Sequence, residues 1–187
     1  LGRLPAVEKA IEQLTKDSHA GVLGDVRAAW DSCAEVGNDI GRVLVERPPI
    51  SIGEDEDTIA PDVDEALDNL RGLRAGGKDA IANIQAEERA RTGISSLKVG
   101  FNRVFGYFIE ISRAHLSNVP KDYERRQTLS NAERYTTPEL KMREAEVLGA
   151  EEKICVLEQR LFRDLRDEVA EKAPRWVTAG KALGALE

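Results

Sequence analysis

Apolar residues at helical spacing run through the first part of the chain. Val7, Ile11 and Leu14 recur at steps of four and three, which places them on one face of a helix. Glycines at positions 21 and 24 predict a break, after which a second helical run continues through residues 30–44. Two consecutive prolines end this run. The acidic stretch over residues 50–61 is then expected to be a surface loop.

A second long helix is predicted over residues 62–91. Its apolar residues fall on one side of the helix, and they are Leu67, Leu70, Ile81 and Ile84. Asp62 or Asp64 can cap its start, because an aspartate carboxylate accepts a hydrogen bond from the free N–H groups of the first turn. Glycines at positions 72, 76 and 77 each weaken a helix by about 1 kcal/mol relative to alanine. A kink is therefore predicted near the middle of this helix.

The hydrophobic period changes to strict alternation after residue 96. Leu97, Val99 and Phe101 alternate with Lys98 and glycine, and the same pattern returns over residues 107–112. This alternation predicts a β-hairpin with one apolar face. Two shorter strands are predicted at residues 125–129 and 132–136, because a lone hairpin is marginal in water and a four-stranded sheet is the more stable solution.

A final helix is predicted from Pro138 to about Ala173. Thr137 can cap this helix, proline suits its first position, and Thr136 with Glu139 has the spacing of a capping box. At about 1.5 Å per residue the helix would be around 50 Å long. The whole pattern predicts a mainly α protein in which two long antiparallel helices carry a small, four-stranded antiparallel β-sheet.

The charge is distributed unevenly along the chain. The formal net charge is −7, from 27 basic and 34 acidic residues. Residues 91–134 hold eight of the basic and four of the acidic side chains, a net charge of +4, which leaves −11 for the rest. A basic segment within an acidic frame indicates a focused site for a polyanion rather than general binding to any surface.

This basic segment lies on the predicted sheet, where Asn102, Ser130 and Asn131 accompany the cations. Cations and short polar side chains suit phosphate oxygens, because the charge releases counterions and the amides fix the register. Phe101 and Tyr107 fall on the apolar face, so core packing is favoured for them over stacking on bases. Contact with a nucleic-acid backbone is therefore favoured over reading of bases, and a solvated charged tip without a ligand is the alternative.

The sequence does not indicate an enzyme. Residues 72–78 nearly match a Walker A phosphate loop, but Asp79 stands where the loop needs a hydroxyl residue, and a helix rather than a strand precedes it. The carboxylates lie in loops or on solvated helix faces, where nothing separates their pKa values for acid–base catalysis. A phosphate-processing enzyme built on residues 72–79 is kept only as an alternative.

The remaining candidate ligands are isolated. The chain has two histidines and two cysteines, and their spacing matches no metal-binding motif. They are His19, His115, Cys33 and Cys155. The two cysteines are expected to be buried, reduced thiols. The longest apolar runs are too short to span a bilayer and no signal peptide opens the chain, so a soluble intracellular protein is expected. Residue 1 is leucine and the one methionine is Met142, so we expect the chain to be cut from a longer protein or processed.

Several long strings resemble one family. SLKVGFNRVFGYFIEIS at residues 96–112, RRQTLSNAERYTTPELK at 125–141 and LGAEEKI at 148–154 resemble the clamp and adjoining lever of bacterial MutS proteins. The similarity reaches back through ERARTGI and ERPPIS. The stretch GEDEDTIAPDV departs from the family, which more often has a glycine-rich segment there, and the first forty residues carry little signal.

The resemblance implies a part in DNA mismatch repair. MutS-like proteins embrace duplex DNA as homodimers, recognise mismatches, and use ATP to become sliding clamps that recruit a MutL-like protein. The mismatch reader and the ATPase are separate domains, so this piece would be non-enzymatic, and ATP and Mg would belong to the missing ATPase domain. The implied place is the bacterial cytoplasm at the nucleoid, without a membrane. The alternative is a helical dimerisation module that binds no nucleic acid.

The resemblance also divides the chain into five segments. These are residues 1–60 of a helical core, an ascending lever helix at 61–96, a clamp at 97–136, a descending lever helix at 137–173, and a return to the core at 174–187.

Six residues are implied to contact the DNA backbone, namely Asn102, Arg103, Arg125, Arg126, Ser130 and Asn131. The two asparagines would donate hydrogen bonds to phosphate, and the three arginines would supply charge. Ser130 stands at a position that is basic in some relatives. Glu133 and Arg134 are expected to pair within the sheet instead.

Overall fold

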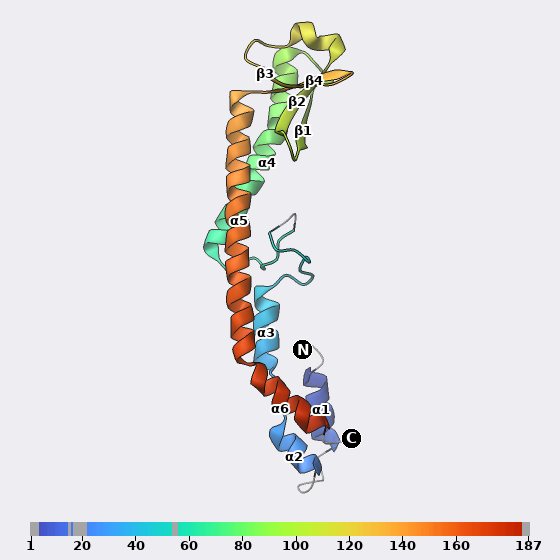
Figure 1. Cartoon of the computed structure of the whole chain (residues 1–187), viewed down its shortest axis with the longest axis vertical. Coiled ribbons are helices and arrows are strands. Elements are labelled where there is room, and N and C mark those ends of the chain that lie inside the picture. The colour runs from blue at the N-terminus through green and yellow to red at the C-terminus, as the bar shows by residue number, and fades with distance from the viewer. Residues whose placement is uncertain (1–3, 15, 17–21, 54–55, 185–187) are drawn as a thin grey trace. The chain divides into compact units, whose positions relative to one another are not determined.

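Six α-helices, one 3-10 helix and four β-strands make up the described part of the chain, which is residues 4–14, 16, 22–53 and 56–184 of the computed structural model (Figure 1). They form two compact units. The helical unit is Leu1–Val63 with Leu157–Glu187, and the sheet unit is Asp64–Val156. The prediction of a mainly helical protein with a small antiparallel sheet is confirmed.

Two long helices frame the sheet unit. Helix α4 (Glu65–Thr92) begins at Asp64, whose Oδ1 accepts a hydrogen bond from the backbone N–H of Leu67 at 2.9 Å. Helix α5 (Pro138–Glu171) begins after Thr137, whose Oγ1 accepts from the N–H of Leu140 at 3.1 Å. Of the two possible caps for α4, Asp64 is therefore the one used, and the predicted cap of α5 is confirmed. The capping box predicted from Thr136 and Glu139 is wrong, because Thr137 takes the cap position.

Helix α4 continues without interruption through its three glycines. The reason lies in α5, which runs beside it in the opposite direction (Figure 1). A Cβ atom at Gly77 would lie 2.5 Å from Cγ2 of Val147 on α5. Gly77 therefore permits the close approach of the two helices, and packing against α5 offsets its weak helical preference.

The four strands form one antiparallel sheet in the order β1-β2-β4-β3. Their bounds are Lys98–Asn102 for β1, Gly106–Ser112 for β2, Glu124–Thr128 for β3 and Ala132–Thr136 for β4. The predicted four-stranded sheet is confirmed, with β3 beginning one residue earlier than expected. A 3-10 helix, η1 (Arg113–Asn118), connects β2 to the loop before β3.

One face of the sheet packs on the helix ends. The core of this unit is a cluster of buried side chains from α4, the sheet and α5, comprising Ile81, Ile84, Ile94, Leu97, Ile109, Ile111, Tyr123, Tyr135, Leu140 and Val147. The predicted burial of Phe101 is wrong, because its side chain is 51% exposed at the end of β1. Phe108 on the opposite face is buried instead, since its ring lies under the guanidinium of Arg134 at 3.9 Å and over Gly100.

The helical unit contains α1 (Leu4–Leu14), α2 (Val22–Ala29), α3 (Ala34–Val43), α6 (Ala173–Gly184) and the end of α5. The prediction of a continuous helix through residues 30–44 is wrong, because residues 30–33 between α2 and α3 are not helical. Cys33, the residue before α3, has φ 47°, a left-handed conformation that a continuous right-handed helix does not contain. Gly24 lies within α2 rather than at a break, and Gly21 lies outside the described residues.

The loop after α3 is fixed by a buried carboxylate. Glu158 on α5 is fully buried, and its Oε1 accepts hydrogen bonds from the backbone N–H groups of Thr58 at 3.1 Å and Ile59 at 3.4 Å. Ile59 also pairs with Leu44 in an isolated antiparallel bridge. Over its described residues the segment is a loop as predicted, but its closing end is buried against the helix rather than at the surface.

A charged cluster ties α6 to the α2–α3 connection. The guanidinium of Arg175 donates to both carboxylate oxygens of Asp31, at 2.6 and 2.9 Å, and also to Glu35. Asp31 accepts a further bond from the backbone N–H of Cys33 at 2.9 Å. These hydrogen bonds lower the pKa of Asp31 to about 2, and the bond from Arg175 makes the largest contribution. Burial raises the pKa of the Cys33 thiol, whereas Cys155 is only half-buried.

We expect the helical unit to lose stability as the pH falls through about 2. The folded pKa of Asp31 lies below its ordinary 3.8, so its stabilising effect is fully present above about pH 4 and is lost as the carboxylate becomes protonated in the folded state. Thermal unfolding followed by tryptophan fluorescence between pH 2 and 5 measures this. An Asp31→Asn variant keeps the shape of the side chain and should lose much of the pH dependence of the unfolding temperature. An unchanged pH dependence in this variant would show that Asp31 is not its source.

Over the described residues, every helix is too short or too polar to cross a bilayer. No group of three His, Cys, Asp or Glu side chains within that part of the chain is placed to hold a metal ion. His19 lies outside the described residues.

Candidate nucleic-acid interface

Four of the six residues implied to contact DNA lie at opposite ends of the sheet, and Arg125 and Arg126 lie along β3 between them. Asn102 and Arg103 lie at the β1–β2 turn, next to the first residue of β2. Ser130 and Asn131 lie at the β3–β4 turn, and β4 begins opposite Ser112, the last residue of β2. Seven residues of β2 separate the two ends, which is about 20 Å at 3.3 Å per residue. The single surface that the sequence predicted is therefore divided in two.

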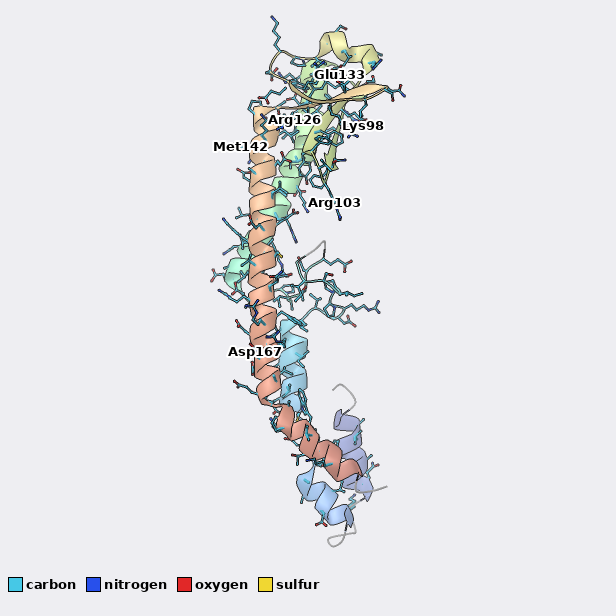
Figure 2. All side chains as sticks on the ribbon, in the orientation of Figure 1. Lys98, Arg103, Arg126, Glu133, Met142 and Asp167 are labelled. Carbon is cyan, nitrogen blue, oxygen red and sulfur yellow. The ribbon has the colours of Figure 1, made fainter. Side chains whose placement is uncertain are left out.

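The β1–β2 turn is organised by Asn102. Its Oδ1 accepts hydrogen bonds from the backbone N–H of Val104 at 2.8 Å and of Phe105 at 3.3 Å. Only the amide N–H groups of Asn102 are then available to a phosphate. Arg103 follows with an exposed side chain, which Figure 2 shows at the lower end of the hairpin, far from Glu133 at the upper end of the sheet.

This turn lies against α5. Gly106 has φ 75°, and Glu144 on α5 accepts a hydrogen bond from the backbone N–H of Tyr107 at 2.8 Å. Burial raises the pKa of the Tyr107 hydroxyl. Val104 and Phe105 are 80% and 45% exposed, so the turn presents apolar side chains beside its arginine.

The β3–β4 turn is organised by an arginine that belongs to neither strand. Arg113, the first residue of η1, donates its backbone N–H to the carbonyl of Asn131 at 3.1 Å, and its guanidinium Nη2 to the carbonyl of Leu129 at 3.3 Å. The N–H of Leu129 bonds to the carbonyl of Ala132 at 2.9 Å. Ser130 and Asn131 are both exposed between these contacts. The sequence reasoning counted Arg113 among the cations but did not assign it to the site.

Strand β3 lies at the edge of the sheet and carries the arginine pair. Arg125 is 63% exposed and lies 3.7 Å from the carboxylate of Glu133. Arg126 falls where the pairing of β3 with β4 shifts register, and its side chain is exposed. The two arginines therefore differ, because one has an acidic partner and the other makes no ion pair within the described chain.

Other cations of the basic segment are neutralised. Arg91 bonds to Glu88 at 2.8 Å and to Asp122 at 3.1 Å, and these hydrogen bonds raise its pKa while they lower that of Asp122. Tyr123 donates its hydroxyl to Glu88 at 2.8 Å, and burial together with this bond raises its pKa. The group joins the end of α4 to the loop before β3.

Arg134 is neutralised on the outer face of the sheet. Its Nε bonds to Glu110 at 2.9 Å, and its Nη1 bonds to Gln127 at 3.0 Å. Glu133 accepts the hydroxyl of Tyr135 at 2.5 Å, and burial raises the pKa of that tyrosine to about 12. The prediction that Glu133 and Arg134 pair within the sheet is confirmed.

The positive charge that remains is concentrated on the sheet and its connections. Four basic side chains between residues 91 and 134 are exposed and make no ion pair in the described structure, and they are Lys98, Arg113, Lys121 and Arg126. Lys98 pairs across the strands with Glu110, two residues before Ser112, so it lies toward the same end of the sheet as Arg113.

The Walker A-like stretch is not a phosphate loop. Residues 72–79 lie entirely within α4, so they form no strand–loop–helix turn. The interpretation of this stretch as helix is confirmed.

Together the fold and the site define a class of protein, a helical hairpin that carries a small, basic, antiparallel sheet. Residues 62–153 match the model of MutS family domain IV, and these bounds agree to within three residues with the sheet unit.

The chain is also similar along its length to proteins named DNA mismatch repair protein MutS. It is 48% identical to that of Halothermothrix orenii over 92% of this chain, 46% identical to that of Brevibacillus brevis over 95%, and 44% identical to that of Solibacter usitatus over 100%. The chain belongs to the MutS family. It spans about a fifth of the length of these relatives, or 19%, 20% and 21% of them respectively.

Proposed function

We propose that this chain contacts the backbone of duplex DNA through its sheet, as part of a larger DNA mismatch repair protein. The observation that carries the proposal is the set of exposed cations without acidic partners on the sheet and its connections, in a chain that is otherwise acidic. Cations that are not already neutralised release counterions when they meet phosphates, which is the main source of affinity for a nucleic-acid backbone.

The spacing of the two turns suits contact along a duplex. Phosphates follow one another at about 3.4 Å per base pair along one strand of B-DNA. An interval of about 20 Å therefore spans roughly six nucleotides. Asparagine and arginine at one end, with serine, asparagine and arginine at the other, would contact phosphates rather than bases, so binding would be independent of sequence and of a mismatch.

The long helices α4 and α5 fit a lever between the sheet and other domains. In the relatives' complete proteins we infer an ATPase with ATP and Mg, a homodimer, and a MutL-like partner outside this chain. No step of catalysis is assigned to the present residues. The buried contact of Gly77 with Val147 and the ion pair of Lys78 with Glu151 at 2.9 Å keep the two helices together, so that the sheet and the helix ends would move as one body.

The test is fluorescence anisotropy of a labelled duplex titrated with the chain from low to physiological salt, with matched and mismatched duplexes. We expect weak binding that ignores the mismatch and falls steeply with salt. An Arg125→Ala/Arg126→Ala variant should bind more weakly, with a salt slope smaller by about one to two units.

The matched control is Arg163→Ala/Arg166→Ala on α5. In this pair Arg163 is exposed, and Arg166 has an acidic partner, Asp167 at 2.7 Å, as Arg125 has Glu133. The control should bind like the unmodified chain. Equal losses in both variants would indicate a general charge effect, and salt-insensitive self-association without DNA binding would favour a dimerisation module.

A further inference from the structure

Arg113 occupies a position that its place in the sequence does not suggest. It is the first residue after β2 and lies sixteen residues before Leu129, yet its backbone and its guanidinium both bond to the β3–β4 turn. Each of these bonds ends on a backbone carbonyl, one on either side of Ser130. The turn and the arginine therefore form one preorganised unit.

The charge of Arg113 is not compensated. In the pairing of β2 with β4, the acidic residue closest to Arg113 is Glu133, which lies two residues after Asn131. Both oxygens of that carboxylate are engaged elsewhere, because Oε2 accepts the hydroxyl of Tyr135 and Oε1 faces Arg125 at 3.7 Å. Arg91 and Arg134, by contrast, each hold a carboxylate within 3.1 Å.

The chemistry of the unit suits a tetrahedral dianion or monoanion. A guanidinium has five N–H donors in a fixed plane, and the bond to Leu129 uses one of them. Ser130 offers a hydroxyl and Asn131 an amide on the same exposed turn. Arginine binds phosphate oxygens through two parallel N–H bonds, which a lysine ammonium cannot reproduce.

We propose that Arg113, together with the side chains of Ser130 and Asn131, forms a binding site for one phosphate of the DNA backbone. This inference rests on the proposed function, since it assigns a residue and a ligand group to the same surface. Arg113 would act both as a phosphate ligand and as the group that positions the turn.

A residue that only supports the turn must be distinguished from one that also binds phosphate. Loss of a structural contact weakens binding without changing the number of counterions released, whereas loss of a phosphate contact also reduces the salt slope by about 0.9 units. Two variants separate these roles. Arg113→Gln removes the charge and keeps a donor for the Leu129 carbonyl, and Arg113→Lys keeps the charge without the planar donor pair.

The experiment is the same anisotropy titration at five salt concentrations, with the chain, both Arg113 variants and Arg163→Gln as the control, each checked by thermal unfolding. We expect Arg113→Gln to bind several-fold more weakly with a slope about one unit smaller. Arg113→Lys should bind with an intermediate affinity and an unchanged slope, and Arg163→Gln should bind like the unmodified chain.

Two results overturn the inference while the proposed function stands. One is an Arg113→Gln variant that binds like the unmodified chain, and the other is weaker binding of both Arg113 variants with unchanged slopes, which leaves only a structural role. Absence of salt-dependent binding by the unmodified chain would instead contradict the proposed function itself.

Discussion

Replacement of Ile109 with alanine should destabilise the sheet unit by about 3 kcal/mol. Ile109 is fully buried at the centre of β2, where it pairs with Val99 on one side and Tyr135 on the other. Truncation of such a side chain loses its transfer free energy and leaves a cavity that the two neighbouring strands cannot fill. This is the largest effect that we expect from a single truncation in the chain.

The distribution of aromatic residues provides the measurement. All three tyrosines, at positions 107, 123 and 135, lie in the sheet unit, and both tryptophans, at positions 30 and 176, lie in the helical unit. Urea unfolding followed by the NMR signals of the tyrosine rings therefore reports on the sheet unit, and tryptophan fluorescence reports on the helical unit.

Ile109→Ala should lower the urea midpoint seen by the tyrosines more than the midpoint seen by the tryptophans. The control is Val104→Ala at the β1–β2 turn, where the side chain is 80% exposed and the change in free energy should stay within about 0.5 kcal/mol. Equal shifts in the two midpoints would show that the two units unfold together. A shift below about 1 kcal/mol would contradict the assignment of Ile109 to a rigid core.

Replacement of Gly77 with leucine should destabilise the same unit by about 2 kcal/mol, although leucine is the better helix former. The added side chain would meet Val147, because even a Cβ atom would lie 2.5 Å from its Cγ2. Val147 is buried and β-branched, so its side chain has little freedom to move aside. The helices would have to separate, which costs more than the gain in helix propensity.

The neighbouring glycine provides a control with the opposite sign. A Cβ atom at Gly76 would have nothing within 4 Å, so Gly76→Ala should stabilise the unit by about 0.5 to 1 kcal/mol through the propensity of alanine alone. A second test pairs Gly77→Ala with Val147→Ala, which makes room for the added methyl group. The double variant should be more stable than the sum of the two single changes predicts. Strict additivity would show that the two residues do not interact.

Much of the fold was determined by local patterns in the sequence. The alternation around Val99 and Ile109 predicted the hairpin, and Thr137 with Pro138 predicted the start of α5, because side-chain period and capping chemistry act over a few residues. The long strings at residues 96–112 and 125–141 were specific enough to indicate the family.

The errors arose where tertiary contacts outweigh local preference. The helical run predicted through residues 30–44 is interrupted over residues 30–33, between α2 and α3. There the carboxylate of Asp31 bonds both to the backbone and to Arg175, which is 144 residues away. Phe101, expected in the core, is exposed, whereas Phe108 on the opposite face is covered by the guanidinium of Arg134.

The arrangement of the candidate site was decided by the sheet topology alone. The order β1-β2-β4-β3 sets the two turns at opposite ends of β2, so Asn102 and Arg103 lie apart from Ser130 and Asn131. The same topology brings Arg113 to the β3–β4 turn. The sequence by itself determined where the cations lie along the chain and that they are concentrated at residues 91–134. Which of them keep their charge uncompensated depends on the positions of Glu88, Glu110 and Glu133, because Coulomb attraction is decided by distance in space rather than along the chain.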